Sequence, residues 1–210
     1  MDIKYTRYTP EEWMAARPDK THLAFYITFR SNVLPHEICD ELVKAYDENP
    51  QLHVTRAQGE GHFKFDQLNL TEAASKEPFK SLHRLVCNYT VPAIEQYYED
   101  IDARDAATRL PSQYGFEHFR INKTMNNGRD GFGWHTDVGD YVSARRFVTA
   151  LYYLDDIDEG GDAAFPMLGL SCYPKKGSLL CFPSTWQWLH CGLKPISNPK
   201  YIMTTFCHYL

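Results

Sequence analysis

The chain has 210 residues, of which 43% are hydrophobic and 14% aromatic, and it carries a formal net charge of −5. This apolar content suffices for one well-filled core, and the acidic balance argues against nucleic acid or an anionic membrane as a partner. The first residues contain no apolar signal segment, and no stretch approaches the roughly 18 apolar residues of a membrane helix, so we expect a cytoplasmic protein that is neither secreted nor membrane-spanning.

The N-terminal part of the chain predicts an irregular arm, a strand and a helix. Residues 1–22 are polar and contain two prolines, with one helical turn expected near Glu11–Ala16. The segment Leu23–Phe29 is rich in β-branched and aromatic residues and predicts a strand. Pro35 then opens an amphipathic helix whose apolar residues recur at helical spacing, and Asn49–Pro50 ends it. This helix is expected to lie against a sheet.

The next two predicted elements, a strand and a long helix, are also expected to support a sheet. His62–Leu68 alternates apolar and polar residues, which predicts a half-buried strand. Apolar residues at helical spacing from Phe79 to Tyr97 predict a long helix, which Pro92 is expected to kink or split because proline lacks a backbone donor. Its apolar stripe is interpreted as a packing face.

From Gly115 onward, short β-prone runs alternate with turn residues. Strands are predicted at 115–122, 146–154, 178–182 and 200–208, which is typical of a sandwich or closed β architecture. The glycine- and asparagine-rich segment 126–133 is either a plain surface hairpin or a lid over a site. We therefore expect one domain over residues 1–210, with support elements in 1–110 and the functional β-structure in 115–210.

The six cysteines contain no Cys-x-x-Cys pair, so neither a zinc ribbon nor a redox motif is expected. In a cytosolic chain they are expected to be reduced and mostly to fill the core. Cys191 stands next to His190. Since neighbours on a strand face opposite ways, thiolate ligation beside His190 is not expected.

Three residues form a candidate metal site. His135 is the only one of the nine histidines with a carboxylate, Asp137, two residues further on. On an extended segment these side chains point to the same side, and His190 from a distant strand would complete a 2-His-1-carboxylate set for iron(II). The His-x-Asp pair alone is weak, because such pairs arise readily by chance. The assignment of an iron site therefore depends on the order of the surrounding motifs.

That order resembles the iron(II)/2-oxoglutarate-dependent oxygenases, and within them the prolyl 4-hydroxylase-like branch. The motifs, which extend over residues 115–208, are His135-Thr-Asp137, Leu151-Tyr-Tyr-Leu154, Gly160-Gly161 with Phe165-Pro166, Pro174-Lys-Lys-Gly177, Leu179-Leu-Cys-Phe182, His190 and Lys200. The resemblance implies an α+β, mainly β fold: a double-stranded β-helix of jelly-roll (cupin-like) type with N-terminal helices packed on one sheet.

The resemblance also implies cofactors and roles. His135, Asp137 and His190 would hold Fe(II), while 2-oxoglutarate and dioxygen would be co-substrates and ascorbate a candidate reductant. Lys200 would bind the far carboxylate of 2-oxoglutarate, with Tyr153 donating a hydrogen bond to the same group. Two strand faces follow from the period of two: one presents Thr149, Leu151 and Tyr153, and the other presents Lys200, Ile202, Thr204 and Phe206. Thr204 is expected to touch the co-substrate and Phe206 to wall the site.

Two positions bear on how closely the chain follows this family. Many relatives have a tyrosine on the strand before the His-x-Asp motif, where this chain has Ile121 or Asn122. Asp137 is retained, which by resemblance favours hydroxylation over halogenation.

The expected function is hydroxylation of an unactivated C–H bond, with 4-hydroxylation of a prolyl residue in a peptide or protein as the leading hypothesis. A free amino acid or another small metabolite is the alternative substrate. A nucleobase demethylase and a non-catalytic β-barrel binding module are weaker alternatives, opposed by the charge and by the intact triad. Four residues flank the motifs and would either line a substrate groove or simply pack: Arg145, Arg146, Trp186 and Trp188.

Overall fold

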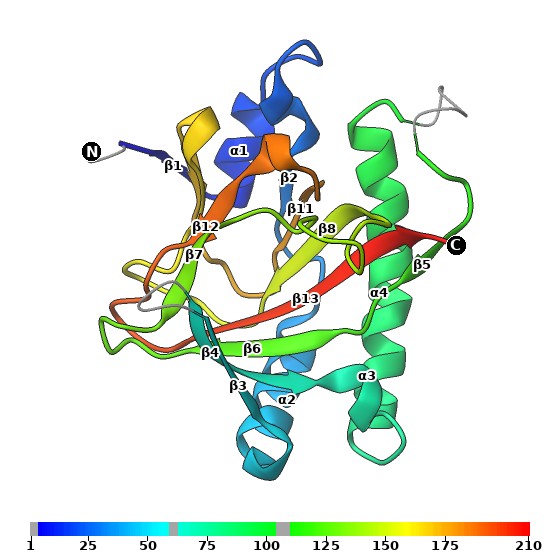
Figure 1. Ribbon diagram of the computed structural model, residues 1–210, viewed down its shortest axis with the longest axis vertical. Helices are drawn as coiled ribbons and strands as arrows, with labels where there is room; N and C mark the ends of the chain where they lie inside the picture. Colours follow the sequence, from blue (N-terminus) through cyan, green and yellow to red (C-terminus); the bar gives the residue numbers. More distant parts are fainter. Residues whose placement is uncertain (1–3, 59–62, 104–109) are drawn as a thin grey trace.

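A computed structural model describes residues 4–58, 63–103 and 110–210. Its strands curl around an interior, and two long helices lie on the outer side of one sheet (Figure 1). The expected mainly β fold with N-terminal helices is confirmed.

The first sheet carries the helices. Its strand order is β4-β6-β13-β8-β11-β2, with β3 paired to β4 and β5 paired to β13, and every pairing is antiparallel. The strands are β2 (Thr28–Arg30), β3 (Val54–Gln58), β4 (Phe63–Asn69), β5 (Tyr114–Phe116), β6 (Arg120–Thr124), β8 (Arg146–Tyr153), β11 (Leu179–Pro183) and β13 (Lys200–Tyr209).

The second sheet faces the first and has the order β1-β10-β9-β12-β7. It contains β1 (Thr6–Tyr8), β7 (Gly131–His135), β9 (Ala163–Phe165), β10 (Leu170–Cys172) and β12 (His190–Gly192). Only the β1–β10 pairing is parallel among the described strands. The two sheets join where β4 also pairs with β7.

The chain alternates between these sheets. Strands β6, β8, β11 and β13 lie in the first sheet, and β7, β9, β10 and β12 lie in the second. Except for β9 and β10, which pair with each other, successive strands therefore cross from one sheet to the other in jelly-roll fashion, which is the double-stranded β-helix that the motifs implied. The ends of β7 and β12 consequently meet across the interior from β8 and β13.

Within the described residues, four α-helices precede this core: α1 (Pro10–Ala16), α2 (His36–Asp47), α3 (Leu70–Ala73) and α4 (Phe79–Asp100). Thr9 and Glu12 form a capping box at the start of α1. The predicted helices α2 and α4 are confirmed, and α4 runs through Pro92 without being split. None of the described helices has the length and apolarity needed to cross a bilayer.

Side-chain alternation divides the buried apolar residues into two layers. On β8, Val148, Ala150 and Tyr152 pack against α2 and α4. Tyr153 and Ile202 point the opposite way, into the space between the sheets. Because the strand period is two, the same strands supply both the helix-packing core and the inner wall of the barrel. The predicted faces of β8 and β13 are therefore confirmed.

The predicted strand Leu23–Phe29 is wrong for most of its length. Leu23–Tyr26 form a 3-10 helix, with the His22 ring accepting from the Ala24 amide, and only Thr28–Arg30 pair as β2. Ile27 is fully buried, and its carbonyl accepts from the Trp13 indole at 2.9 Å. The apolar composition of this segment reflects burial under α1 rather than extended pairing.

The predicted strand 115–122 is instead two strands, β5 and β6, that pair successively with β13. The break falls at Glu117–Phe119, where the Phe119 amide donates to the Thr71 hydroxyl and its carbonyl accepts from the Leu70 amide. Strands β1 and β3 and helix α3 were not predicted. In the segment 126–133, Asn127 caps a turn and β7 begins at Gly131, while the lid role remains a prediction.

Candidate metal centre and co-substrate pocket

The three predicted metal ligands lie together at one end of the barrel interior. His135 and His190 are directly paired across β7 and β12, and the Nε2 atoms of both rings lie 3.7 Å from the Asp137 carboxylate. One ligand atom from each residue lies within 4.8 Å of the others. Among the described residues, this is the group of histidine, cysteine and acidic side chains able to hold an ion, and Cys191 is not part of it.

Hydrogen bonds orient both imidazole rings so that a defined ring nitrogen of each faces the candidate metal site. His135 Nδ1 lies 2.8 Å from the Gly133 carbonyl, and His190 Nδ1 lies 3.0 Å from the Trp188 carbonyl. A carbonyl can only accept, so both Nδ1 atoms carry the proton and both Nε2 atoms present a lone pair. Burial lowers the pKa of His190 to about 4, which keeps this ring neutral.

The Asp137 carboxylate is held from behind. The Thr149 hydroxyl donates to Asp137 Oδ2 at 2.6 Å, and Ser184 lies 3.0 Å from the same hydroxyl. Arg146 Nη1 donates to the Asp137 backbone carbonyl at 2.9 Å. Thr149 was predicted on the pocket face, and its hydroxyl contacts this carboxylate, so it would orient the third predicted ligand.

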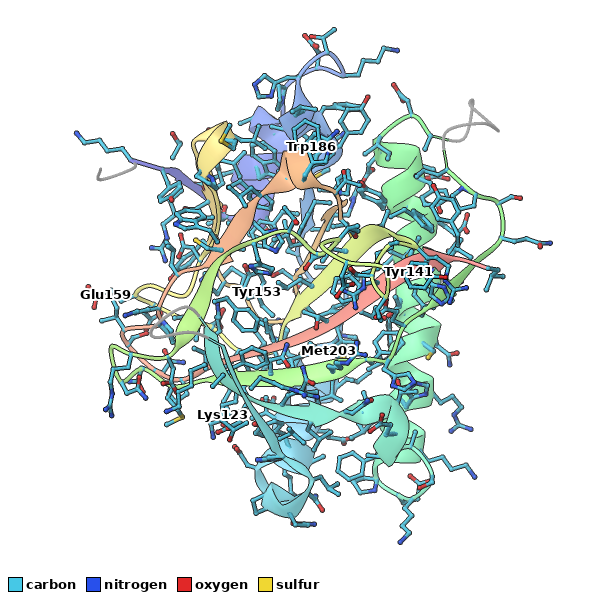
Figure 2. All side chains as sticks on the ribbon, in the orientation of Figure 1. Lys123, Tyr141, Tyr153, Glu159, Trp186 and Met203 are labelled. Carbon is cyan, nitrogen blue, oxygen red and sulfur yellow. The ribbon has the colours of Figure 1, made fainter. Side chains whose placement is uncertain are left out.

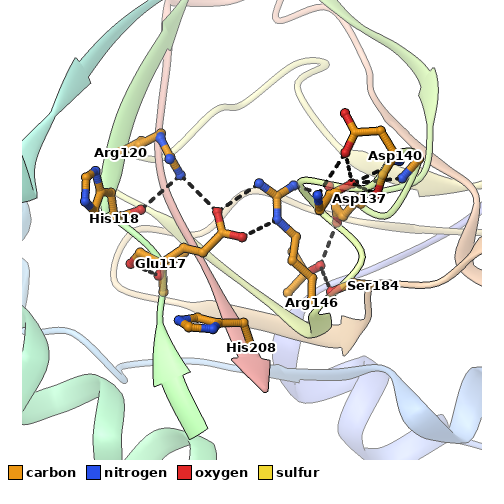
Figure 3. A network of polar contacts seen from close by, with 12 residues as sticks. Glu117, His118, Arg120, Asp137, Asp140, Arg146, Ser184 and His208 are labelled. Carbon is orange, nitrogen blue, oxygen red and sulfur yellow. Dashed lines mark hydrogen bonds and ion pairs between the residues drawn. The ribbon is translucent and has the colours of Figure 1, made fainter. Parts of the chain in front are cut away.

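Arg146 belongs to a charged network that borders the site (Figure 3). Its guanidinium holds both oxygens of Glu117, at 2.6 and 2.8 Å, and lies 4.0 Å above the Phe206 ring. Arg120 approaches the same Glu117 carboxylate from the other side at 3.6 Å. Arg146 therefore links the backbone of Asp137 to a wall of the cavity.

A cavity of about 90 Å³ extends from the three ligands into the barrel. Its far end holds Lys200, which is 3% exposed and donates to the Gly161 carbonyl at 2.8 Å. A Cβ placed on Gly192 would lie 3.2 Å from Lys200 Nζ, so this glycine leaves room for the ammonium group. Burial lowers the pKa of Lys200 to about 8. A buried ammonium at the end of a cavity is suited to a carboxylate.

A second charged pair lies behind Lys200. Asp162 is 3% exposed and accepts two hydrogen bonds from Arg7 of β1, both at 2.8 Å, and one from the Ser171 hydroxyl at 2.9 Å. Arg7 also lies 3.8 Å from the Tyr173 ring centre. Because Arg7 neutralises Asp162, the Lys200 charge stays available to the cavity. Neither Arg7 nor Asp162 was singled out from the sequence, and a bidentate pair 155 residues apart leaves no local signal.

The other predicted site residues also line this cavity: Leu151, Tyr153, Thr204 and Phe206. Tyr153 lies in the space enclosed by the strands (Figure 2), and its hydroxyl donates to the Cys172 carbonyl at 3.4 Å. The predicted bond from Tyr153 to the co-substrate, and the contact of Thr204 with it, remain predictions.

The structure distinguishes between Ile121 and Asn122, the two residues that could stand where many relatives carry a tyrosine. Ile121 is fully buried in the helix-side core, whereas Asn122 lines the cavity. Gln67 donates to Asn122 Oδ1 at 2.9 Å, so the Asn122 amide nitrogen is turned toward Thr204, 3.5 Å away. Gln67 and Phe132, which also lines the cavity, were not predicted as site residues.

The four residues that flank the motifs differ in exposure: Arg145, Arg146, Trp186 and Trp188. Trp188 is 8% exposed and donates to the Leu23 carbonyl, and Arg146 is held in the network above, so both have packing roles. Arg145 and Trp186 are exposed. Only these two remain candidates for a substrate groove.

The residues fit the iron and 2-oxoglutarate that the motifs implied. Two imidazoles with proton-bearing Nδ1 atoms and one oriented carboxylate are the donor set of non-haem iron(II) oxygenases. Fold and site together define a double-stranded β-helix protein with a 2-His-1-carboxylate centre. Residues 119–208 match the sequence model of the 2OG-Fe(II) oxygenase superfamily. The enzyme class and its use of Fe(II), 2-oxoglutarate and dioxygen are confirmed.

Solved structures give the same fold. A viral collagen prolyl hydroxylase from Paramecium Bursaria Chlorella virus-1, in a 2OG complex, is 19% identical, with 88% of this chain and 97% of that chain covered and a TM-score of 0.64. A Trichoplax adhaerens prolyl hydroxylase, in complex with a hypoxia inducible factor oxygen degradation domain peptide fragment, is 16% identical, with coverages of 87% and 83% and a TM-score of 0.66. A Pseudomonas putida prolyl-4-hydroxylase is 17% identical, with coverages of 94% and 99% and a TM-score of 0.61. At these identities the likeness shows the fold alone. A search of curated proteins finds no match.

Proposed function

We propose that this chain hydroxylates C4 of a prolyl residue in a peptide or protein, using Fe(II), 2-oxoglutarate and dioxygen. The proposal rests on one arrangement: three ligands, His135, Asp137 and His190, at one end of a cavity whose other end is the buried Lys200. The prolyl substrate is carried over from the similar structures, which are prolyl hydroxylases.

Each residue of the arrangement has a separate task. His135, Asp137 and His190 would hold the iron, and Thr149 would keep the Asp137 carboxylate turned toward it. Lys200 would hold the far carboxylate of 2-oxoglutarate. When bound, iron with 2-oxoglutarate and dioxygen supplies the oxidising power that replaces C–H by C–OH and releases succinate and carbon dioxide.

Part of the cavity wall would limit the access of water to this chemistry. Four apolar side chains contribute to the lining: Phe132, Leu151, Ile202 and Phe206. A dry cavity strengthens the attraction between Lys200 and a carboxylate and suppresses side reactions of the oxidant.

A peptide substrate is supported by the surface next to the ligands. Trp134 precedes His135, Tyr141 follows Asp137 by a few residues, and Trp186 precedes His190. Their exposed fractions are 46%, 95% and 74%. Large apolar side chains left exposed beside a site are typical of a surface that binds a polypeptide.

We further propose that residues 1–210 act as a single oxygenase domain. Strands β1 and β2, from the first part of the chain, are edge strands of the two sheets, and α2 and α4 cover the outer face of the first sheet. The functional β-structure at 115–210 would thus depend on 1–110 for its edges and its core.

The test is turnover of prolyl peptides with Fe(II), 2-oxoglutarate and ascorbate, followed by mass spectrometry. The expected result is one added oxygen per proline, loss of a deuterium label placed at C4, and an equal amount of succinate. His135→Ala and Asp137→Ala should lose both products and the bound metal. His36→Ala, which removes an exposed histidine on α2, is the matched control.

Other outcomes would redirect the proposal. Hydroxylation of free amino acids but not of peptides would replace it with the small-molecule alternative. Unchanged succinate formation in both the His135 and the Asp137 variants would contradict the roles given to these residues.

A further inference from the structure

Arg120 lies on the inner face of the first sheet, next to residues that line the cavity but not among them. It is paired directly opposite Thr204 of β13, and residues opposite one another on antiparallel strands project to the same face. Thr204 lines the cavity, as does Asn122 two residues further along β6. The Arg120 side chain is 26% exposed, so a ligand can reach it from solvent.

Arg120 shares the Glu117 carboxylate with a second arginine, Arg146. Arg120 Nη1 donates to the His118 carbonyl at 3.2 Å and lies 3.6 Å from Glu117 Oε2. Glu117 is already held at both oxygens by Arg146. Glu72, another carboxylate on this side, is 69% exposed and lies 3.6 Å from the His118 ring.

The remaining edge of the Arg120 guanidinium is the one that this protein uses for carboxylates. Arg7, Arg30 and Arg146 each hold an acidic side chain with Nε and Nη2. Within the described part of the chain, Arg120 Nε and Nη2 have no hydrogen-bond partner. Two parallel N–H groups match the two oxygens of a carboxylate in geometry and charge.

We propose that the Nε and Nη2 edge of Arg120 binds a carboxylate of the substrate. This inference rests on the proposed hydroxylase function and narrows its substrate to one that carries a carboxylate near the target carbon. The carboxylate is either an aspartate or glutamate side chain of a peptide or the α-carboxylate of a free amino acid.

The first experiment varies the substrate and leaves the protein intact. Prolyl peptides with aspartate or glutamate beside the proline are compared with the same peptides carrying asparagine or glutamine, and free proline is compared with prolinamide. The acidic member of one pair should have a KM about tenfold lower, since charge-assisted bidentate hydrogen bonds contribute on this scale. The pair that responds identifies the source of the carboxylate.

The second experiment varies Arg120. Arg120→Gln should raise KM for the acidic substrate about tenfold and leave the amide substrate unchanged, while Arg120→Lys, which keeps the charge without the fork, should fall between. Arg84→Gln removes the same charge from an exposed position on α4, beyond the helix-packed face of the sheet, and should change nothing. Melting curves of each variant establish that it is folded.

Binding of the same peptides to metal-free protein separates this inference from the proposed function. Tight, salt-sensitive and Arg120-dependent binding of acidic peptides without hydroxylation would remove the hydroxylase function and keep the carboxylate site. Hydroxylation with equal KM for acidic and amide substrates, or equal losses in the Arg120 and Arg84 variants, would overturn the carboxylate site alone.

Discussion

At the scale of single residues, the Thr149 hydroxyl is the closest contact of the Asp137 carboxylate, at 2.6 Å. It leaves one oxygen turned toward each histidine, because Oδ1 lies 3.7 Å from His135 and Oδ2 lies 3.7 Å from His190. Without that hydrogen bond the carboxylate would rotate among orientations, and metal binding would have to select one of them.

We therefore predict that Thr149→Val weakens metal binding about tenfold, the lower range for removal of a hydrogen bond behind a ligand. Anaerobic titration with Mn(II) measures the affinity. Thr90→Val is the matched control, because Thr90 is also fully buried and accepts from Tyr152 at 2.9 Å, but lies in α4. The control should lower stability and keep the metal affinity. Equal metal affinity in the Thr149 variant and wild type would contradict this role.

Lys200 gives a pH dependence with a definite sign. Burial lowers its pKa from 10.5 to about 8, so the free protein loses this charge as the pH rises through about 8. Affinity for 2-oxoglutarate should be full below pH 8 and fall above it, by up to tenfold per pH unit. Burial raises the pKa of the neighbouring Cys191 to about 11, so this thiol stays neutral in that range.

Titration calorimetry between pH 7 and 9.5 measures this dependence, with Lys200→Arg as the control because arginine keeps its charge. Stability of the ligand-free protein should change in the opposite direction. Between about pH 8 and 10.5 the unfolded chain holds the Lys200 proton and the folded chain does not, so this residue makes folding more favourable as the pH rises. A flat binding profile in wild type would show that Lys200 does not bind the carboxylate.

The strand period placed His135 and Asp137 on one side, and the order of the family-like motifs pointed to His190 and Lys200. The sequence could not predict Asp162, Arg7, Gln67 or Arg120, since their roles arise from pairings between distant strands. The choice between Ile121 and Asn122 also needed the register of β6 against β13, because a shift of one residue turns every side chain to the other face.

At the scale of elements, β1 connects the N-terminal arm to the co-substrate end of the cavity. It is an edge strand of only three residues, yet it pairs with β10 and delivers Arg7 to Asp162. The sequence predicted an irregular arm here, because a short polar segment has no alternation to reveal a strand. Strands β9 and β10, also of three residues each, are likewise too short to show an alternation and were not predicted.

We predict that Arg7→Gln raises KM for 2-oxoglutarate several-fold with little change in kcat. The freed Asp162 carboxylate would compete with the co-substrate for the Lys200 ammonium, which already donates to the adjacent Gly161 carbonyl. Steady-state kinetics with varied 2-oxoglutarate measure the effect.

Arg30→Gln is the matched control, because it also breaks a bidentate arginine–aspartate pair, with Asp100 of α4, on the helix side of the sheet. It should destabilise the fold and leave KM unchanged. If both variants raise KM for 2-oxoglutarate equally, β1 has no specific link to the site.

At the scale of the whole molecule, the long strands and helices were predicted well because the two faces of each element have different surroundings, which gives the sequence a regular pattern. β8 and β13 present one face to α2 and α4 and the other to the cavity, so their alternation is continuous. The strand prediction for Leu23–Phe29 failed because Ala24 and Ile27 are buried without pairing in a strand, and only Thr28 and Phe29 of this segment pair, in β2. Burial and strand formation leave the same composition in a short segment, and only the tertiary structure separates them.

The barrel interior also makes ligand binding a property of the whole fold, because the ligands and Lys200 come from β7, β12, β13 and the turn after β7. Unfolding separates all of them, so any ligand of this cavity binds the folded state alone. At a hundredfold excess over its dissociation constant, such a ligand stabilises the fold by about 2.7 kcal/mol. For a chain of this size that corresponds to a rise in melting temperature of roughly 5–10 °C.

We accordingly predict that Mn(II), used as a redox-inactive substitute for Fe(II), raises the melting temperature alone, and that 2-oxoglutarate adds a further rise only when metal is present. Anaerobic thermal melts with each ligand and with both measure this. In Lys200→Ala the metal shift should persist and the 2-oxoglutarate shift should shrink, because the metal ligands remain while the carboxylate loses its cation. A 2-oxoglutarate shift that needs no metal would place the co-substrate elsewhere, and the absence of any shift would mean that the three residues do not form a metal site.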